Sequence, residues 1–241
     1  MDVPSITVIV PAFNAEHFIV DALECIREQG YDGLKIIVVD DGSTDRTAQL
    51  VAQYPDVSCM HQENRGPAAA RNHALERCRS EFIAFLDVDD LWPAGTLAFL
   101  SQRLIQNPDV DLVVGRVQYL VPQRGEAGAQ RFDALGAPCV AFNLGAGLYR
   151  ASAFKKVGRF DESMRTSEDV DWFMRAREHG LRMDFCERVT LLYRRHAGNM
   201  TVDRASAHSD FVRALKQSLD RRRQRHLQPK PLPNLAGRDR E

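Results

Sequence analysis

The sequence has few cysteines, and their placement excludes two common ways of holding a small fold together. There are five among 241 residues, at Cys25, Cys59, Cys78, Cys139 and Cys186, and no two form a Cys-x-x-Cys pair. An odd number of widely spaced cysteines argues against a disulfide framework and against a cysteine-built zinc site. The cysteine pattern therefore predicts free thiols in a reducing compartment, which is the cytoplasm.

Long hydrophobic runs are also missing. No apolar stretch approaches the roughly 18–20 residues that a helix needs to cross a bilayer. The N-terminus has no basic region before an apolar stretch, and Pro11 interrupts the first apolar run, so no signal peptide is expected. With 44% hydrophobic and 27% charged residues, the composition is that of an ordinary soluble globular protein.

The net charge is close to zero, but the charged residues are unevenly distributed along the chain. A formal charge of −1 gives no electrostatic reason to expect binding to nucleic acid. Residues 204–241 nevertheless hold ten Lys and Arg against four Asp and Glu, a balance of +6, which leaves −7 on the rest of the chain. A basic tail of this kind is either solvated or in peripheral contact with an anionic membrane, and the sequence leaves both interpretations open.

Strands and helices are expected to alternate through the first 106 residues. Short β-branched or apolar runs predict four strands, and each is followed by a segment with helical spacing. The predicted strands are Ile6–Val10, Lys35–Val39, Val57–His61 and Glu81–Leu86, and the predicted helices are Ala15–Gln29, Thr47–Tyr54, Pro67–Arg79 and Pro93–Gln106. This alternation predicts right-handed βαβ units and a mostly parallel, doubly wound α/β sheet.

The second half of the sequence is less regular. We expect strands at Val110–Val121 and Val189–Tyr193, helices at Ala151–Val157 and Glu168–His179, and a Gly- and charge-rich loop at Pro122–Ala137. From about Asp203 a polar helix is expected. It should give way to disorder around the proline-rich segment Gln228–Pro233.

Polar motifs follow three of the predicted strands at their carboxyl ends. They are Pro11–Asn14, Asp40-Asp41 and Asp87-Val88-Asp89. In parallel sheets the carboxyl ends of the strands share one edge, where ligands bind, so these motifs are expected to converge. Asp87 and Asp89 suit a hard divalent cation such as Mg²⁺ or Mn²⁺, which leaves its other positions to water and phosphate. The alternative is a helix N-terminal cluster, with Asp90 as a cap.

Other segments are weaker evidence of a functional site when each is taken alone. Asp40–Ser43 could be a ribose or base site, or it could be a plain turn with a helix cap. Phe13 could be a ring beside the base, or it could be a core residue. The segment Ser167–Phe173 has three acids at a helix start, which is more than capping needs, so one could serve as a general base. Tyr193–His196 could meet a metal or phosphate, or face solvent after an edge strand.

Taken together, these segments resemble the family 2 inverting glycosyltransferases. The matching segments occur in the family's order between Ser5 and Thr201, and the tail after Asp203 lies outside the resemblance. They are Val8–Asn14, Val39–Asp45, Asn64–Gly66, Ala70–Asn72, Phe85–Asp90, Val157–Glu162, Glu168-Asp169 and Tyr193–His196. The resemblance implies a GT-A-type, Rossmann-like fold with a smaller antiparallel region on the acceptor side. It divides the chain into a nucleotide-sugar-binding half (1–106), an acceptor-binding half (107–203) and a helical or disordered basic tail (204–241).

The resemblance also implies roles for residues that would bind the donor. Phe13 would lie beside the nucleotide base, and Asp41 would hydrogen-bond that base while Asp40 supports the turn. Arg71 would reach the base or its ribose, and Asp87 would contact the ribose. The implied donor is a nucleoside-diphosphate-sugar, with a UDP-sugar expected first.

The remaining implied roles concern the reaction. Asp89 would ligate Mn²⁺ or Mg²⁺ at the diphosphate, with His196 near the metal. Asp169 would be the general base toward a hydroxyl of a glycan or lipid-linked acceptor, with Glu168 beside it. The Gln-x-x-Arg-Trp motif of processive synthases is absent from the sequence, so hexosyltransferase-type transfer of a single sugar is expected, in polysaccharide or other glycoconjugate synthesis.

Two other functions remain open at this point. A nucleotidyltransferase that makes a nucleotide-sugar shares the sheet and the metal carboxylates, but it should have a Gly-rich, basic loop after the first strand, which Pro11–Ala15 is not. A non-catalytic module that binds a nucleotide-sugar would have no need of Asp87, Asp89 and Asp169 together.

Overall fold

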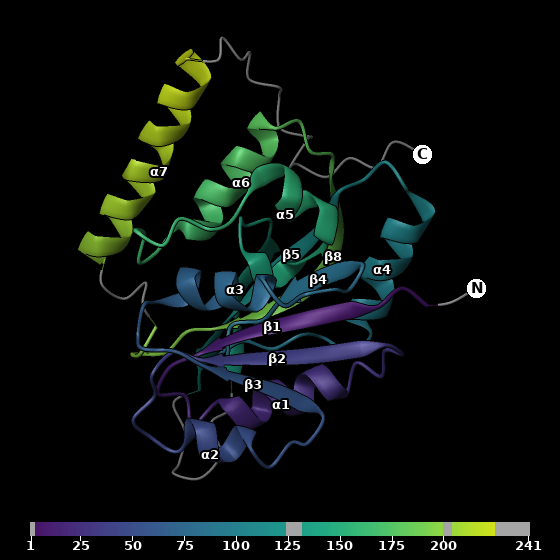
Figure 1. Cartoon of the computed structure of the whole chain (residues 1–241), viewed down its shortest axis with the longest axis vertical. Helices are drawn as coiled ribbons and strands as arrows, with labels where there is room; N and C mark the ends of the chain where they lie inside the picture. The colour runs from purple at the N-terminus through teal and green to yellow at the C-terminus, as the bar shows by residue number, and fades with distance from the viewer. Residues whose placement is uncertain (1–2, 124–131, 200–203, 225–241) are drawn as a thin grey trace.

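The computed structural model of the chain describes residues 3–123, 132–199 and 204–224. In these residues the chain forms one eight-stranded sheet. Helices lie on both sides of the sheet, as Figure 1 shows. The strand order is β3-β2-β1-β4-β7-β5-β6, and β8 pairs with β5. Six of the strands run in one direction, and only β6 and β7 oppose them.

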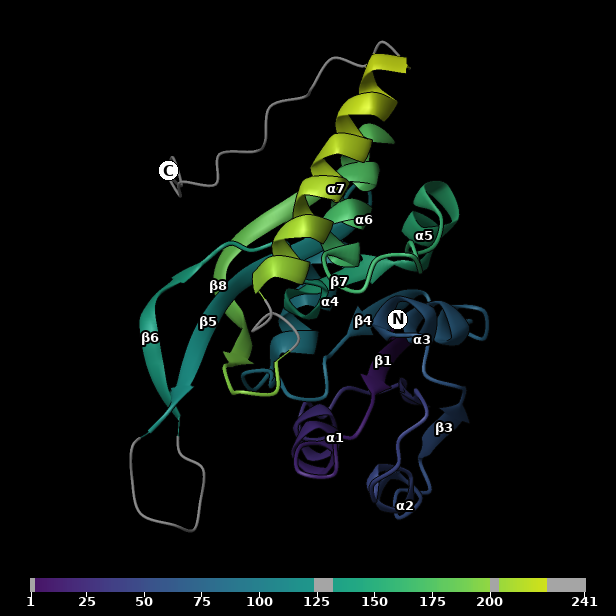
Figure 2. The same cartoon turned by 90° about the vertical axis from the view of Figure 1, so that its left-hand side faces the viewer.

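The first half of the sheet is wholly parallel. It consists of β1 (Ile6–Ala12), β2 (Leu34–Asp40), β3 (Val57–His61) and β4 (Phe82–Phe85), and β1 lies between β2 and β4. All seven residues of β1 are buried, as expected for a parallel strand that is covered on both faces. Figures 1 and 2 show α3 on one side of these strands and α1 on the other. The four strands match the predicted ones to within two residues at each end.

The second half of the sheet is mixed. Strand β7 (Gly147–Arg150) pairs antiparallel with β4 and with β5 (Leu112–Pro122), and β8 (Met183–Arg194) runs parallel to β5. At Gly115 the strands β5 and β8 come so close that an added Cβ would lie 2.6 Å from the carbonyl oxygen of Arg188. Glycine is therefore required there for close approach of the two backbones.

The prediction of a loop at Pro122–Ala137 is partly wrong. Residues Pro122–Ala137 were expected to be irregular, but β6 (Phe132–Cys139) pairs antiparallel with β5 from Phe132 onward. Most of β6 is exposed and its sequence lacks a strand pattern, so pairing with its neighbour determines its structure rather than its own propensity. Residues 124–131 of the expected loop lie outside the described residues.

The helices follow the expected order, and most are shorter than expected. They are α1 (Ile19–Arg27), α2 (Thr47–Val51), α3 (Pro67–Leu75), α4 (Thr96–Gln106), α5 (Ala151–Val157), α6 (Glu168–Glu178) and α7 (Arg204–Gln224), with a short 3-10 turn at Leu144–Ala146. The largest difference is at α1, because residues 16–18 form a turn before it. None of the helices in the described ranges is long and apolar enough to pass through a membrane.

An aromatic cluster packs α5 and α6 against the middle of the sheet. The indole of Trp172 in α6 stacks on Phe154 in α5 at 4.7 Å between ring centroids, and it meets Tyr149 of β7 edge-on at 5.6 Å. Phe85, the last residue of β4, contacts Tyr149, Phe154 and Phe160. This packing places the start of α6 next to the carboxyl end of β4, since the same rings contact both elements.

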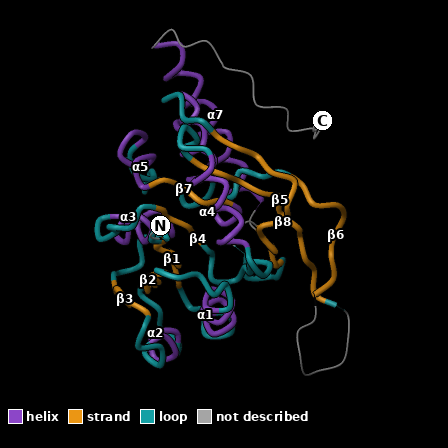
Figure 3. Tube along the Cα trace, turned by 90° about the vertical axis from the view of Figure 1, so that its right-hand side faces the viewer, coloured by secondary structure: helices purple, strands orange, loops and turns teal. Residues whose placement is uncertain are grey.

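Helix α7 is the polar helix expected after Asp203, and it packs along α6, as Figure 2 shows. Figure 3 shows α7 from the opposite side. The expected division at residue 203 and the expected disorder from Gln228 onward both lie outside the described residues.

Candidate functional site

The polar motifs predicted for the site are on one edge of the sheet. They follow the carboxyl ends of β1, β2, β4 and β8, and these strands all run in the same direction. The strands are parallel because the helices that connect them return the chain to the opposite edge each time. The start of α6 reaches the same edge, because Arg71 joins its first residue to Asp87.

Arg71 joins the two halves of the chain at this edge. It lies in α3 with only 4% of its side chain exposed, and it donates from Nη2 to Asp87 Oδ1 and from Nη1 to Glu168 Oε1. Burial opposes its charge, but Asp87 and Glu168 outweigh burial and raise the pKa of Arg71 further. Arg71 therefore holds an aspartate that follows β4 to the first residue of α6. Its expected contact with a base or ribose stays a prediction.

Asp169 lies in the first turn of α6, beside this ion pair. Its Oδ1 accepts a hydrogen bond from Val170 N at 2.7 Å. Burial and then the charge of Glu168 raise the pKa of Asp169 to about 7, although the positive charge of Arg71 opposes this. Burial also raises the pKa of Glu168. A carboxyl whose pKa is near neutral pH is suited to accept a proton from a hydroxyl.

The backbone turns sharply into α6. Ser167 has φ of 62°, in the left-handed region that residues other than glycine rarely occupy. This conformation directs Glu168 toward Arg71 at the start of the helix. Backbone strain of this kind persists only where the surrounding contacts impose it.

Asp89 and His196 form a second polar group, at the ends of β4 and β8. His196 Nε2 lies 3.0 Å from Asp89 Oδ2, and Asn199 Nδ2 donates to the same oxygen at 2.9 Å. His196 Nδ1 accepts from Gly198 N at 3.1 Å, so in this arrangement Nε2 has the proton and donates to Asp89. Burial raises the pKa of Asp89, and the neighbouring charge of Asp87 adds to the effect.

This pair fits a divalent cation with few protein ligands. A carboxylate oxygen and an imidazole nitrogen face each other, and both atom types are ligands for Mn²⁺. To bind a cation, Nε2 would have to lose its proton, and Nδ1 would then hold the proton in place of its hydrogen bond from Gly198 N. Within residues 3–123, 132–199 and 204–224 there is no group of three or more His, Cys, Asp or Glu that could hold a metal. A cation here would therefore complete its coordination with phosphate oxygens and water, as Mg²⁺ and Mn²⁺ commonly do.

Two interpretations of neighbouring residues are wrong. Asp90 does not cap a helix: its Oδ1 accepts from Arg194 N at 3.0 Å and the helix starts only at Thr96. Arg194 is 3% exposed, so it does not face solvent after the strand. Its guanidinium donates to the carbonyl of Asp89 and, at 3.0 Å, to Asp21. Both side chains hold the loop of Asp89 in place.

The opposite end of the edge has the residues predicted for nucleotide binding. Phe13 follows β1 and is 49% exposed, which excludes the core alternative. Asp40 accepts from Ser43 N at 3.0 Å and lies 3.1 Å from His61 Nδ1, so it supports the turn as expected.

Asp41 is buried, and its carboxylate organises the loop between β3 and α3. It accepts from Arg65 N at 2.9 Å, from Gly66 N at 2.7 Å and from Gln62 Nε2 at 2.7 Å. These contacts were not predicted, and they use both carboxylate oxygens. The expected hydrogen bond from a base to Asp41 stays a prediction.

Two site residues were missed in the sequence. Asn199 lies three residues after His196 and contacts both Asp89 and the backbone of His196. Gln62 contacts Asp41 and, through Oε1, His73 Nδ1 at 3.0 Å. Gln62 follows the predicted strand Val57–His61, and Asn199 follows the segment Tyr193–His196. A polar residue just after a predicted strand was therefore the signal by which both could have been found.

Comparison with known proteins identifies the family. The family model described as Glycosyl transferase family 2 matches residues 7–195. A pre-mycofactocin glycosyltransferase of Mycobacterium tuberculosis is 34% identical over 209 residues, which is 79% of this chain and 43% of that protein. An uncharacterized glycosyltransferase of Rickettsia typhi is 28% identical over 184 residues, or 70% of this chain and 58% of that protein. The chain thus spans about half the length of these relatives.

Solved structures share the fold. Residues 1–349 of TarS of Staphylococcus aureus, in complex with UDP-GlcNAc, have a TM-score of 0.68 at 24% identity, covering 83% of this chain and 61% of that one. The mannosyltransferase PcManGT of Pyrobaculum calidifontis, in complex with GDP-Man and Mn²⁺, has a TM-score of 0.71 at 24% identity, covering 91% and 65%. The expected GT-A-type α/β fold is confirmed by these likenesses. Because the family model spans most of the chain, this protein belongs to glycosyltransferase family 2.

Proposed function

We propose that this protein transfers a single sugar from a nucleoside-diphosphate-sugar to an acceptor hydroxyl, with inversion at the anomeric carbon. The observation that supports this most is the Arg71 bridge between Asp87 and Glu168. It brings Asp169, with a pKa of about 7, to the edge of the sheet where a donor is expected. The complexes of TarS with UDP-GlcNAc and of PcManGT with GDP-Man are consistent with such a donor.

In this proposal Asp169 takes the proton of the acceptor hydroxyl as its oxygen attacks the anomeric carbon. The new carbon–oxygen bond forms on the face opposite the leaving group, and the bond to the nucleoside diphosphate breaks in the same displacement. The diphosphate leaves with the bonding electron pair. General-base help of this kind contributes about 10²–10⁴-fold to the rate. No Ser or Cys nucleophile is required, because no covalent intermediate forms.

Asp89 and His196 are the residues that would hold Mn²⁺ or Mg²⁺. When bound, such a cation offsets the negative charge that grows on the departing diphosphate. Asn199 and Arg194 support this role, because they hold the carboxylate and the carbonyl of Asp89. His196 is held in turn by Phe18, whose ring lies 4.7 Å from the imidazole.

Phe13, Asp40 and Asp41 would bind the nucleotide. The exposed ring of Phe13 offers a flat apolar surface for a base. The buried Asp41 stabilises the loop after β3 by accepting hydrogen bonds from its backbone. A UDP-sugar is the donor we propose first. The acceptor we propose is a glycan or lipid-linked hydroxyl.

We also propose that α7 contacts the cytoplasmic face of a membrane. Four apolar side chains of this helix are 38% to 47% exposed: Phe211, Val212, Leu215 and Leu219. At 100° per residue they lie in one stripe, and Arg222 and Arg223 follow them in the last turn. An apolar stripe beside arginines suits an anionic lipid surface.

A donor screen tests the proposed reaction. UDP-, GDP- and other nucleotide-sugars are incubated with the protein and Mn²⁺ or Mg²⁺, and release of nucleoside diphosphate is measured with and without sugar acceptors. We expect slow release in water for one donor and faster release with an acceptor. A variant with Asp169→Asn distinguishes transfer from contaminating activity, since it should bind the nucleotide and release little. Binding without any release, by the wild type, would instead favour a non-catalytic module.

A further inference from the structure

Helix α7 lies beyond the segment that the family model matches, which ends at residue 195. It nevertheless packs along α6, whose first turn contains Asp169. The face of α7 that meets α6 has small or polar side chains, among them the buried Ala214 and Ser218. The contacts between the two helices therefore depend mostly on hydrogen bonds and ion pairs made by a few polar side chains of α7.

The first contact is directly before the turn into α6. Asp210 of α7 accepts hydrogen bonds with one oxygen, Oδ2, from Thr166 N at 3.0 Å and from Thr166 Oγ1 at 3.1 Å. Thr166 precedes Ser167, which has the left-handed backbone conformation described above. Asp210 therefore fixes the chain three residues before Asp169.

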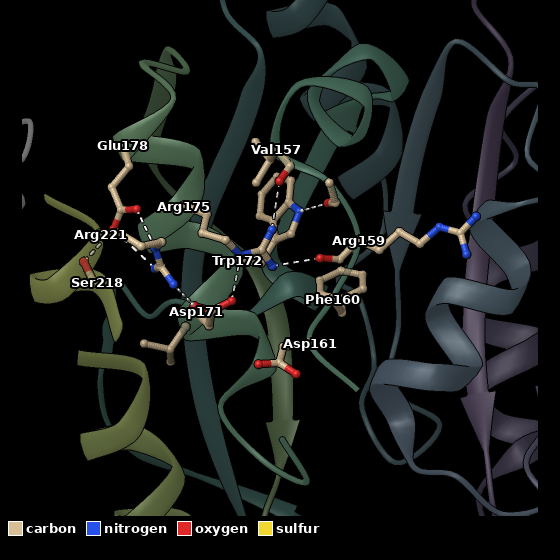
Figure 4. Close-up of polar contacts among 12 residues, drawn as sticks. Val157, Arg159, Phe160, Asp161, Asp171, Trp172, Arg175, Glu178, Ser218 and Arg221 are labelled. Atoms are coloured by element: carbon tan, nitrogen blue, oxygen red, sulfur yellow. Dashed lines mark hydrogen bonds and ion pairs between the residues drawn. The ribbon is translucent and has the colours of Figure 1, made fainter. Parts of the chain in front are cut away.

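The second contact is at Asp171, two residues after Asp169, and Figure 4 shows the side chains that meet there. Asp171 is 1% exposed, and its carboxylate accepts from Arg175 Nε at 2.7 Å and from Arg221 Nη1 of α7 at 3.1 Å. Arg221 Nε also donates to Glu178 at 2.7 Å, and Ser218 Oγ donates to Glu178 at 2.6 Å. Arg221 therefore joins two carboxylates that lie two turns apart on α6.

Arg175 extends this network to the segment before α6. Its Nη1 donates to Val157 O at 3.0 Å and its Nη2 donates to Arg159 O at 2.8 Å. In the same region Trp172 Nε1 donates to Gly158 O at 3.1 Å (Figure 4). The rotation of α6 about its own axis is thus fixed from both sides, by α7 and by residues 157–159.

We propose that Asp210 and Arg221 of α7 are positioning residues for Asp169, and that they act through Thr166 and Asp171. This inference rests on the proposed function, because it assumes that Asp169 is the base. The two contacts lie on either side of Asp169 and hold a strained turn in place, so their loss lets the carboxylate move. A displacement of about 1 Å in a catalytic group can cost about 10²-fold in rate.

The experiment compares Asp210→Ala with Asp210→Asn. Asparagine keeps an oxygen that can accept both hydrogen bonds of Thr166, whereas alanine has none. Asp220→Ala is the matched control, because Asp220 is an exposed acid on the same helix. We expect Asp210→Ala to lower kcat about tenfold or more with little change in the donor KM, while Asp210→Asn and Asp220→Ala stay near the wild type.

Arg221→Ala repeats the test at the second contact, and Lys216→Ala is its control, because Lys216 is an exposed basic residue of the same helix. Should Arg221→Ala fold poorly, the Asp210 series still decides the outcome, since Asp210 is not part of a buried ion pair. A purely stabilising role predicts lower melting temperatures with kcat unchanged well below melting. That result for Asp210→Ala would overturn the proposal.

Hydrogen exchange gives a readout that does not depend on turnover. In Asp210→Ala the amides of residues 166–170 should exchange faster than in the wild type, and those of β1–β4 should not change. If the wild type turns over no donor, the proposed reaction fails, and hydrogen exchange alone decides this inference. Equal exchange at residues 166–170 in both proteins would then overturn it.

Discussion

The pH dependence of transfer gives the sharpest test of Asp169 as the base. Burial and the charge of Glu168 raise its pKa to about 7. A general base works only when ionised, so activity should rise with pH through about 7 and then level off. At pH 6 about one-tenth of the Asp169 carboxyls are ionised, so the rate should be about one-tenth of its plateau.

Substituting Glu168→Gln should move this profile. The substitution removes the negative charge that makes Asp169 harder to ionise, while Arg71 keeps its contact with Asp87. A charge change at an adjacent carboxyl shifts a pKa by about one unit or more, which is about 1.4 kcal/mol per unit. With the midpoint lowered to about 6, the variant should have about half of its own plateau rate at pH 6.

The assay is release of nucleoside diphosphate from about pH 5 to about pH 9, with donor and acceptor in excess. Glu28→Gln is the matched control, because Glu28 is an exposed glutamate at the end of α1. Its profile should match the wild type. The reasoning is refuted if Glu168→Gln and the wild type have the same midpoint.

Asp169→Asn tests the same residue more directly. It should lose about 10²–10⁴-fold in transfer and still bind nucleoside diphosphate. Since the pKa of Asp169 is raised, its carboxyl favours folding at low pH, and this contribution is lost as pH rises from its usual value of 3.8 through about 7. The variant should therefore be at least as stable as the wild type at pH 8, so unfolding would not explain its inactivity. Unimpaired transfer would reject Asp169 as the base.

Four further predictions concern the metal, the ion pair, the sheet and α7. Chelation of divalent metal should abolish donor turnover, and added Mn²⁺ should restore it; full activity in chelator would contradict a metal at Asp89. Arg71→Ala leaves Glu168 buried without its cation and should lower the free energy of unfolding by about 3–5 kcal/mol in urea titrations. Gly115→Ala should cost about 1–3 kcal/mol in the same assay, because β8 leaves no room for a Cβ. Phe211→Asp should reduce sedimentation with vesicles that contain phosphatidylserine, and equal sedimentation of variant and wild type would argue against membrane contact through α7.

Much of the parallel half of the sheet could be predicted from the sequence. Ile6–Val10 is a run of five residues rich in β-branched side chains, and Val57–His61 is equally short, so their lengths favour strands; the helices between the strands follow from spacing. Helix ends were less accurate, as at α1, since a turn and a helix start have similar compositions. Strand β6 was missed because it depends on pairing with β5.

The sequence also indicated which residues gather at the site, but not what they contact. Asp87, Asp89, Asp169 and His196 were singled out from their positions at strand and helix ends. Their partners are distant in sequence: Asp89 contacts His196 at a separation of 107 residues. A pattern of residue types gives no distances between such segments, because only packing determines which strand ends become neighbours.

The sequence by itself determined the class of fold, the order of the elements in its first 106 residues and the edge of the sheet where the polar motifs lie, because periodicity and strand ends are local properties. Only the tertiary structure decided that Arg71 holds Asp87 to Glu168, that Arg194 is buried, and that α7 packs on α6 through Asp210 and Arg221. These contacts join residues from separate elements. Their burial and charge depend on the packing of the whole domain, which no local pattern contains.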